Sequence, residues 1–142
     1  MSDHLSLRLE ATMDELARLD AAVEAFSQAR GWAPEFEFHI KLMLEELVTN
    51  IVSYGYDGDE GGSHAIEVEI DSGAESVTVE VMDNGRAFDP LAEAPLPDLT
   101  SSVEERQVGG LGVHLVRTMS DEVRYERKGD KNCLTLVKRR NA

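Results

Sequence analysis

One stretch decides how the fold of this chain is built: Glu45-Glu46-Leu47-Val48-Thr49-Asn50-Ile51-Val52-Ser53-Tyr54-Gly55-Tyr56. It closes a run over residues 34–54 in which apolar residues recur at steps of three and four, the period of an α-helix. Those residues are Phe36, Ile40, Met43, Leu44, Leu47, Ile51 and Tyr54. The spacing therefore predicts a long amphipathic helix that lays one apolar stripe on a core.

Two polar residues lie on one flank of this stripe. Glu46 and Asn50 are one helical turn apart, so their side chains can act on one ligand together. Glu45, Thr49 and Val52 point away from the stripe, and the helical register therefore favours Glu46 over its neighbour as the carboxylate at the edge of the core. Taken alone, the stretch favours an ordinary amphipathic helix with a solvated Glu and a C-terminal Asn, since the pattern Glu-x-x-x-Asn is common.

Composition limits the classes of protein to which this chain can belong. Its 142 residues, 42% of them apolar, suit one globular domain. The net charge of −14 argues against nucleic acid or an anionic membrane as the main partner. With Cys133 as the single cysteine no intrachain disulfide can form, and there is neither a signal peptide nor an apolar run of membrane-spanning length. We expect a cytoplasmic protein.

The N-terminal part predicts a strand followed by two helices. Apolar and polar residues alternate over 5–9, which is the pattern of a strand. Thr12 and Glu15 have the spacing of a capping box at the start of a helix, which Gly31 ends. Pro34 suits the first turn of the second helix.

The remaining part predicts a hairpin, a long connection, a short helix and a final pair of strands. The segments are a hairpin over 66–81, a connection with three prolines over 89–108, a helix over 111–119, and strands over 122–127 and 133–138. A connection of that length in a compact domain is typically functional, so we expect a lid there. The order predicts an α+β two-layer sandwich, with helices on one face of a mixed, mostly antiparallel sheet.

Two further stretches have the composition of a ligand site. Asp83 has the same parity as the apolar residues of its strand, so it ends the strand pointing to the core side, where a carboxylate needs a donor such as a purine amine. Gly85 follows at once. Gly110-Leu111-Gly112 opens a helix, and glycines there leave backbone N–H groups facing an anion. A plain turn and a flexible hinge are the alternatives for these two stretches.

Taken together, the three stretches resemble the GHKL, or Bergerat-fold, ATPase superfamily. Glu46-x-x-x-Asn50 is similar to its N box, Asp83-x-Gly85-x-x-Phe88-Asp89 to its first glycine box, and Gly110-Leu111-Gly112 to its second. Residues 132–136 resemble the closing strand, whose threonine, Thr135 here, lies near the adenine. Within the superfamily the chain is most similar to the stand-alone anti-sigma factor serine/threonine kinases, which are single small domains.

The resemblance implies an ATP site and a reaction. Asn50 would ligate Mg²⁺, Asp83 would accept from the adenine amine with support from Thr135, and the glycine boxes, including Phe88 and Leu111, would surround the nucleotide. Glu46 would be the general base. The implied substrate is a serine on an anti-anti-sigma (STAS-type) protein, and the implied second partner is a sigma factor.

Two other functions remain open at this point. The chain could be a non-catalytic, ATP-responsive module that switches partners, although the presence of Glu46 favours an enzyme. It could also be a detached histidine-kinase catalytic domain, but only a few residues precede the first strand, and such a domain needs a preceding helix with a phospho-accepting histidine. Whether the protein forms a homodimer is left open by the sequence.

Overall fold

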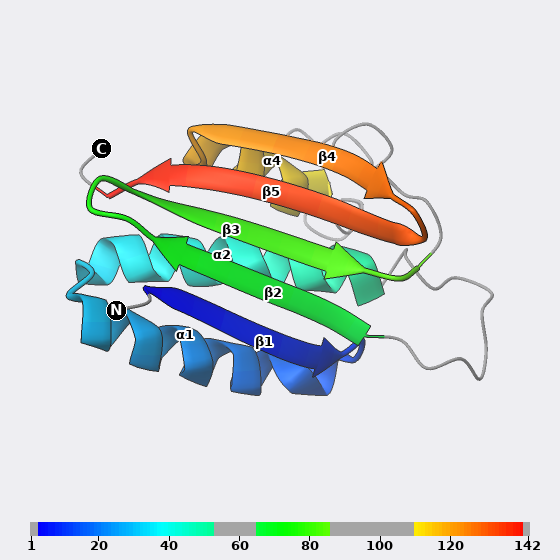
Figure 1. Cartoon of the computed structure of the whole chain (residues 1–142), viewed down its shortest axis with the longest axis horizontal. Coiled ribbons are helices and arrows are strands. Elements are labelled where there is room, and N and C mark those ends of the chain that lie inside the picture. Colours follow the sequence, from blue (N-terminus) through cyan, green and yellow to red (C-terminus); the bar gives the residue numbers. More distant parts are fainter. Residues whose placement is uncertain (1–2, 53–64, 86–109, 141–142) are drawn as a thin grey trace, which may run out of the picture.

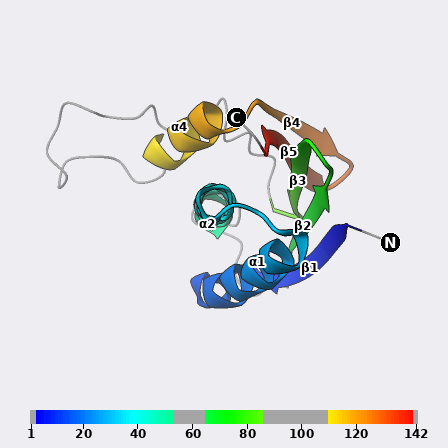
Figure 2. The ribbon, with the colours of Figure 1, turned by 90° about the vertical axis from the view of Figure 1, so that its left-hand side faces the viewer.

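An open sheet with helices on one face makes up the described part of the chain (Figures 1 and 2). The computed structural model describes residues 3–52, 65–85 and 110–140. Its strands are β1 (His4–Glu10), β2 (Ala65–Ser72), β3 (Ser76–Asp83), β4 (Glu122–Lys128) and β5 (Lys131–Arg139), in the sheet order β1-β2-β3-β5-β4. Each neighbouring pair is antiparallel. The predicted α+β sandwich is confirmed, and the sheet is antiparallel throughout instead of mixed.

The helices occupy one side of the sheet. They are α1 (Leu16–Arg30), α2 (Pro34–Asn50) and α4 (Gly110–Met119), with a 3₁₀ turn at Met13–Glu15 before α1. Seen end-on in Figure 2, α2 lies between α1 and α4. Pro34 stands in the first turn of α2, as predicted. The α-helical part of α2 ends at Asn50, and residues 51–52 continue in a wider π-type turn; the predicted end at Tyr54 lies outside the described residues.

The predicted capping box at the start of α1 does not form. The side chain of Thr12 makes no capping hydrogen bond. The carboxylate of Glu15 instead accepts from the backbone N–H of Glu10 at 3.0 Å and from Arg18 at 3.1 Å. The short 3₁₀ turn places Glu15 in reach of the end of β1, so it ties the strand to the helix instead of capping the helix.

The core lies between the inner face of the sheet and the helices. The alternation in β2 and β3 places four side chains of each strand on the inner face, three of them apolar, and the antiparallel register sets Val68 opposite Val81. On α2 the buried face includes Ile40 and Leu44, as predicted. It also includes Val48, which is fully buried, so this face is wider than the stripe read from the sequence. The hydrophobic core therefore fixes α2 over the middle of the sheet.

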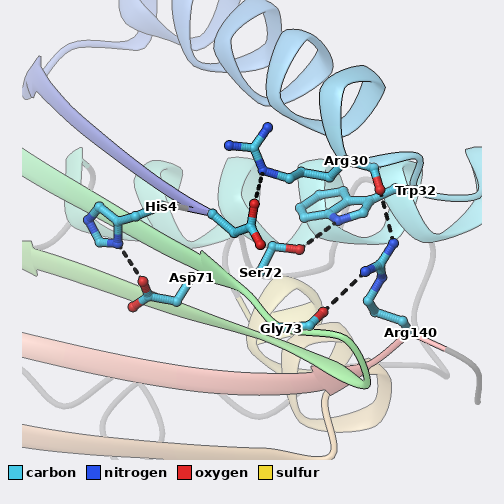
Figure 3. A network of polar contacts seen from close by, with 8 residues as sticks. His4, Arg30, Trp32, Asp71, Ser72, Gly73 and Arg140 are labelled. Carbon is cyan, nitrogen blue, oxygen red and sulfur yellow. Dashed lines mark hydrogen bonds and ion pairs between the residues drawn. The ribbon is translucent and has the colours of Figure 1, made fainter. Parts of the chain in front are cut away.

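Polar contacts hold the end of the molecule where β2 turns into β3 (Figure 3). The indole N–H of Trp32 donates to Ser72 Oγ at 3.1 Å, which joins the α1–α2 connection to the sheet. The guanidinium of Arg140 donates to the carbonyl of Gly73 at 3.1 Å and to that of Arg30 at 3.2 Å. These bonds tie the end of β5 to both layers.

Several predictions concern segments outside the described residues. The predicted lid, 89–108, falls there, as do Tyr54 and Phe88. Among the residues that are described, no helix has the length and apolar character needed to cross a membrane.

Candidate nucleotide site

Three of the predicted site stretches lie at the ends of elements that point to one end of the molecule. The helix α2 ends with Asn50 and the strand β3 ends with Asp83, both at the right-hand end in Figure 1. The helix α4 runs in the opposite direction to α2 in that view, so its first residue, Gly110, faces toward the same end. Residues far apart in sequence are therefore gathered here by the sheet order and the helix directions.

Asp83 is the buried carboxylate of this site. Its side chain is 6% exposed, on the inner face, as its strand parity predicts. Its Oδ1 accepts from the backbone N–H of Gly85 at 2.9 Å and from the amide of Asn132 at 3.0 Å. Burial raises the pKa of Asp83 above its ordinary value, while these hydrogen bonds and the charge of Arg127 oppose that rise. Both hydrogen bonds from the described residues end on Oδ1, so Oδ2 is the oxygen left to accept from a ligand.

Asn132, on β5, is a site residue that the sequence analysis missed. It is 5% exposed and pairs directly with Asp83 in the β3–β5 register. Its Oδ1 accepts from the hydroxyl of Tyr125 at 2.5 Å and from the guanidinium of Arg127 at 3.2 Å. The same guanidinium donates to the carbonyl of Gly85 at 2.9 Å. The strands β4 and β5 therefore supply a polar network behind Asp83.

Thr135 does not lie beside Asp83. It pairs with Glu80 in the β3–β5 register, so both side chains are on the outer face of the sheet, and the Thr135 hydroxyl lies 3.5 Å from Glu80 Oε2. Paired residues in an antiparallel sheet share a face, and adjacent residues alternate faces. The parity that carries Asp83 inward therefore carries Asn132 inward and Thr135 outward. The same parity rule, applied to the closing strand, could have found Asn132.

Asn50 is a buried amide at the end of α2. Its side chain is 3% exposed, and within the described residues its Nδ2 has no hydrogen-bond partner. A buried amide without a partner costs free energy unless a ligand supplies one. An amide oxygen is an accepted ligand of Mg²⁺, which needs few protein ligands because it keeps several waters. The unpartnered Nδ2 is a donor and suits a ligand oxygen such as that of a phosphate, whereas Oδ1 is the atom that could ligate the ion.

Glu45 and Glu46 have different surroundings. Glu46 is half-buried and one turn before Asn50. Glu45 interacts with Asp20 of α1, and burial, together with the hydrogen bond and the repulsion from Asp20, raises the pKa of Glu45 to about 7. Glu45 faces Asp20 of α1 and not the flank that carries Glu46 and Asn50. Its side chain is held in the contact between α1 and α2.

The glycines of the two predicted boxes are partly described. Gly85 is buried, and both its N–H and its carbonyl are bonded, to Asp83 and Arg127 respectively. Gly110, Leu111 and Gly112 form the first turn of α4. The first N–H groups of a helix have no partner within the helix, so this turn has donors suited to an anion. In the described part of the chain, no group of three or more His, Cys, Asp or Glu side chains could hold a metal ion.

Comparison with known proteins identifies the family. The chain belongs to the histidine kinase-like ATPase domain family, whose sequence profile matches residues 9–138. The serine/threonine-protein kinase BtrW of Bordetella bronchiseptica is 32% identical, over 75% of this chain and 72% of its own. The serine-protein kinase RsbW of Listeria monocytogenes is 28% identical, over 87% of this chain and 80% of its own. An anti-sigma F factor of Clostridium botulinum is also 28% identical, over 88% of this chain and 78% of its own. The resemblance stated from the three sequence stretches is confirmed.

Solved structures confirm the fold. The RsbU and RsbW domains of Rv1364c from Mycobacterium tuberculosis superpose with a TM-score of 0.64 at 18% identity. The superposition includes 96% of this chain and 32% of that longer chain. A histidine kinase domain from Erythrobacter litoralis superposes with a TM-score of 0.56 at 18% identity, covering 90% of this chain and 60% of the other.

Proposed function

We propose that this protein is an ATP-dependent serine/threonine kinase of the anti-sigma factor class. It phosphorylates a serine of an anti-anti-sigma protein of the STAS type, and it binds and sequesters a sigma factor in the cytoplasm. The names of the relatives support this class. One observation carries the nucleotide part: a buried carboxylate, Asp83, ends β3 at the same end of the molecule as Glu46 and Asn50.

Each proposed role follows from the chemistry of its group. The Oδ2 atom of Asp83 accepts a hydrogen bond from the adenine amine, and the first turn of α4, Gly110–Gly112, donates backbone N–H groups to phosphate. Asn50 would hold Mg²⁺, which supplies neutralisation of the phosphate charge. Positioning and charge neutralisation provide most of the acceleration in phosphoryl transfer, so few side chains are needed.

Glu46 is the proposed base for the transfer step. Its carboxylate takes the proton of the substrate serine hydroxyl, and the serine oxygen then forms a bond to the γ-phosphorus. The bond between that phosphorus and the oxygen bridging to the β-phosphate breaks, and ADP leaves. A positioned base contributes about 10²–10⁴-fold in rate.

Two variants test the two halves of this proposal. Glu46→Gln keeps the side-chain shape and removes the base, so it should bind Mg²⁺–ADP as the wild type does and lose serine phosphorylation by about 10²–10⁴-fold. Asp83→Asn presents a mixed donor–acceptor group where an acceptor is needed, so it should weaken ADP binding itself. Binding is measured by calorimetry and transfer by ATP labelling of an anti-anti-sigma protein co-purified from the native host.

Glu35→Gln is the matched control, because Glu35 is on the same helix and its side chain is 85% exposed. Wild-type transfer rates in Glu46→Gln would remove Glu46 from the role of base. A wild type that binds ATP and the partner but transfers no phosphate would instead identify a partner-switching module. Unchanged ADP affinity in Asp83→Asn would refute the adenine assignment.

A further inference from the structure

The polar network behind Asp83 extends across three strands. Arg127 and Tyr125 of β4 donate to Oδ1 of Asn132 on β5, and the amide nitrogen of Asn132 donates to Asp83 on β3. A guanidinium can only donate, and an ionised carboxylate can only accept. The two ends of the network therefore fix which way the Asn132 amide faces, which a lone asparagine leaves undetermined.

The direction of this network has a consequence for Asp83. Among the described residues, its Oδ1 accepts from Gly85 N–H and from Asn132 Nδ2, and such donors favour the ionised carboxylate. Burial acts in the other direction and favours the protonated form. The charge of Arg127 adds to the donors. Burial therefore favours the protonated form of Asp83, and the hydrogen-bond donors and the charge of Arg127 favour the ionised form.

The protonation state of Asp83 decides which purine base can form a hydrogen bond with it. Adenine presents an amino group at its sixth position, a donor, whereas guanine presents a carbonyl oxygen there, an acceptor. An ionised carboxylate accepts from the first and repels the second. A protonated carboxyl group can donate, and it therefore tolerates guanine.

We propose that Arg127 and Tyr125 act through Asn132 as positioning residues that keep Asp83 ionised and oriented, and so set the preference of the site for adenine over guanine nucleotides. This inference rests on the proposed function, because it assumes that Asp83 contacts the base. It assigns a role to Arg127 and Tyr125, which no predicted motif contains, and to Asn132 at the start of the closing strand.

Among the described residues around Asp83, Arg127 is the charged group that affects its protonation. On β2 its pairing partner is the apolar Ile66. Lys131 of β5 and Glu67 of β2 pair with each other at 3.2 Å on the outer face. Glu46 of α2 lies at the same end of the molecule. Among the described charged side chains, Arg127 is the one whose charge shifts the pKa of Asp83, and it lowers that pKa.

The test compares ADP and GDP affinities of the whole chain by calorimetry between about pH 5 and pH 8. The wild type should prefer ADP throughout. Arg127→Met should retain that preference at pH 8 and lose about tenfold of it toward pH 5, as Asp83 gains a proton and GDP binding improves. Arg127→Lys keeps the charge and should restore most of the wild-type profile. A purely structural defect would weaken both nucleotides together at every pH.

Arg124→Met is the matched control. Arg124 belongs to the same strand but pairs with Thr135, on the outer face, so the variant loses the same charge without touching the network. If Arg124→Met and Arg127→Met show the same ADP-to-GDP ratio at each pH, the proposed role of Arg127 is wrong while the adenine site stands. A wild type that binds no ADP would overturn the proposed function and this inference with it.

A milder variant covers the case in which Arg127→Met does not fold. Tyr125→Phe keeps the ring and removes the hydroxyl that donates to the Asn132 amide oxygen. Its ADP-to-GDP ratio should fall in the same direction, by about two- to fivefold at pH 5. A ratio equal to the wild-type value at both ends of the pH range would contradict the role of Tyr125.

Discussion

Glu45 and Glu46 show how far two adjacent carboxylates can differ. The helical register turns Glu46 toward the flank that carries Asn50 and turns Glu45 toward α1. There Glu45 meets Asp20, with Lys41 and Glu46 as the other charges that act on it. Lys41 lowers the pKa of Glu45, but burial and Asp20 outweigh it, and the pKa is raised to about 7. A carboxyl group that holds its proton near neutral pH therefore joins the two helices.

The first prediction concerns the effect of Glu45 on stability. An acid whose pKa is higher in the folded than in the unfolded chain binds more protons when folded, so the free energy of unfolding falls as pH rises between the two values. For Glu45 that interval runs from 4.5 to about 7. Glu45→Gln imitates the protonated form, so it should match the wild type near pH 4.5 and be more stable at pH 8. Urea unfolding across this range measures the difference.

Glu122→Gln serves as the control, because Glu122 is exposed on β4, away from the contact between α1 and α2. If wild type and Glu45→Gln lose stability in parallel as pH rises, Glu45 is not the group responsible. The result also bears on enzyme assays: Glu45→Gln is a poor neutral control for Glu46→Gln, because it alters the contact between α1 and α2.

Individual site residues were predictable where one local rule sufficed. Strand parity placed Asp83 on the inner face, and helical register separated Glu46 from Glu45. The resemblance suggested Thr135 as the residue near the adenine, and parity in β5 contradicts that position. The partner found there, Asn132, is a polar residue at an apolar parity, the same signal as Asp83. Its donors Tyr125 and Arg127 depend on the β4–β5 register, which no single stretch determines.

At the level of elements, the connection between α1 and α2 depends on one glycine. Gly31 ends α1 with φ of 70° and donates its N–H to the carbonyl of Ser27. Trp32 N–H reaches the same carbonyl at 3.1 Å, which closes the helix and sends the chain toward Pro34. Side chains other than that of glycine are strained in this backbone conformation.

The second prediction is that Gly31→Ala lowers the free energy of unfolding by about 1 kcal/mol. A Cβ at this position would meet nothing within 4 Å, so the cost comes from the backbone conformation alone. Gly31→Asn should cost less, because asparagine tolerates the left-handed region better than alanine. Urea denaturation of the three proteins gives the order. Equal stability of wild type and Gly31→Ala would show that the turn relaxes without strain.

Elements were predicted better than their ends. Alternation and helical period located each described strand and helix because those patterns reflect burial directly. The capping box at Thr12 failed because Glu15 bonds to Glu10 at the end of β1, a contact that the local sequence does not specify. The sheet order was also beyond the sequence, since the pairing of β3 with β5 joins segments about fifty residues apart.

For the whole molecule, the balance of charge sets the conditions for binding a nucleotide. The chain carries −14 at neutral pH, and ATP is a polyanion. Repulsion between the two has to be offset locally, by the first turn of α4 and by a divalent cation. The buried amide of Asn50 is the described group suited to hold that cation.

The third prediction is therefore that ATP stabilises the fold strongly only when Mg²⁺ is present. At about 100 times its dissociation constant, Mg²⁺–ATP should raise the free energy of unfolding by about 2.7 kcal/mol. Chelation by EDTA should remove most of this gain, and Asn50→Ala should reduce the part that EDTA removes. Thermal unfolding with ATP, with and without EDTA, measures it. The same gain in EDTA as in Mg²⁺ would exclude a metal-assisted site.

The convergence of the two chain ends on the β2–β3 turn has a practical consequence. Asp3 accepts from the N–H of Ser72 at 2.8 Å, and the N–H of Arg140 donates to Glu75 at 2.8 Å, at the end of the molecule away from Asp83 (Figure 1). The start of β1 and the end of β5 therefore lie at the same turn, an arrangement that suits circular permutation of residues 3–140. By the same geometry, a reporter protein fused before β1 or after β5 would emerge at the end of the molecule away from Asp83.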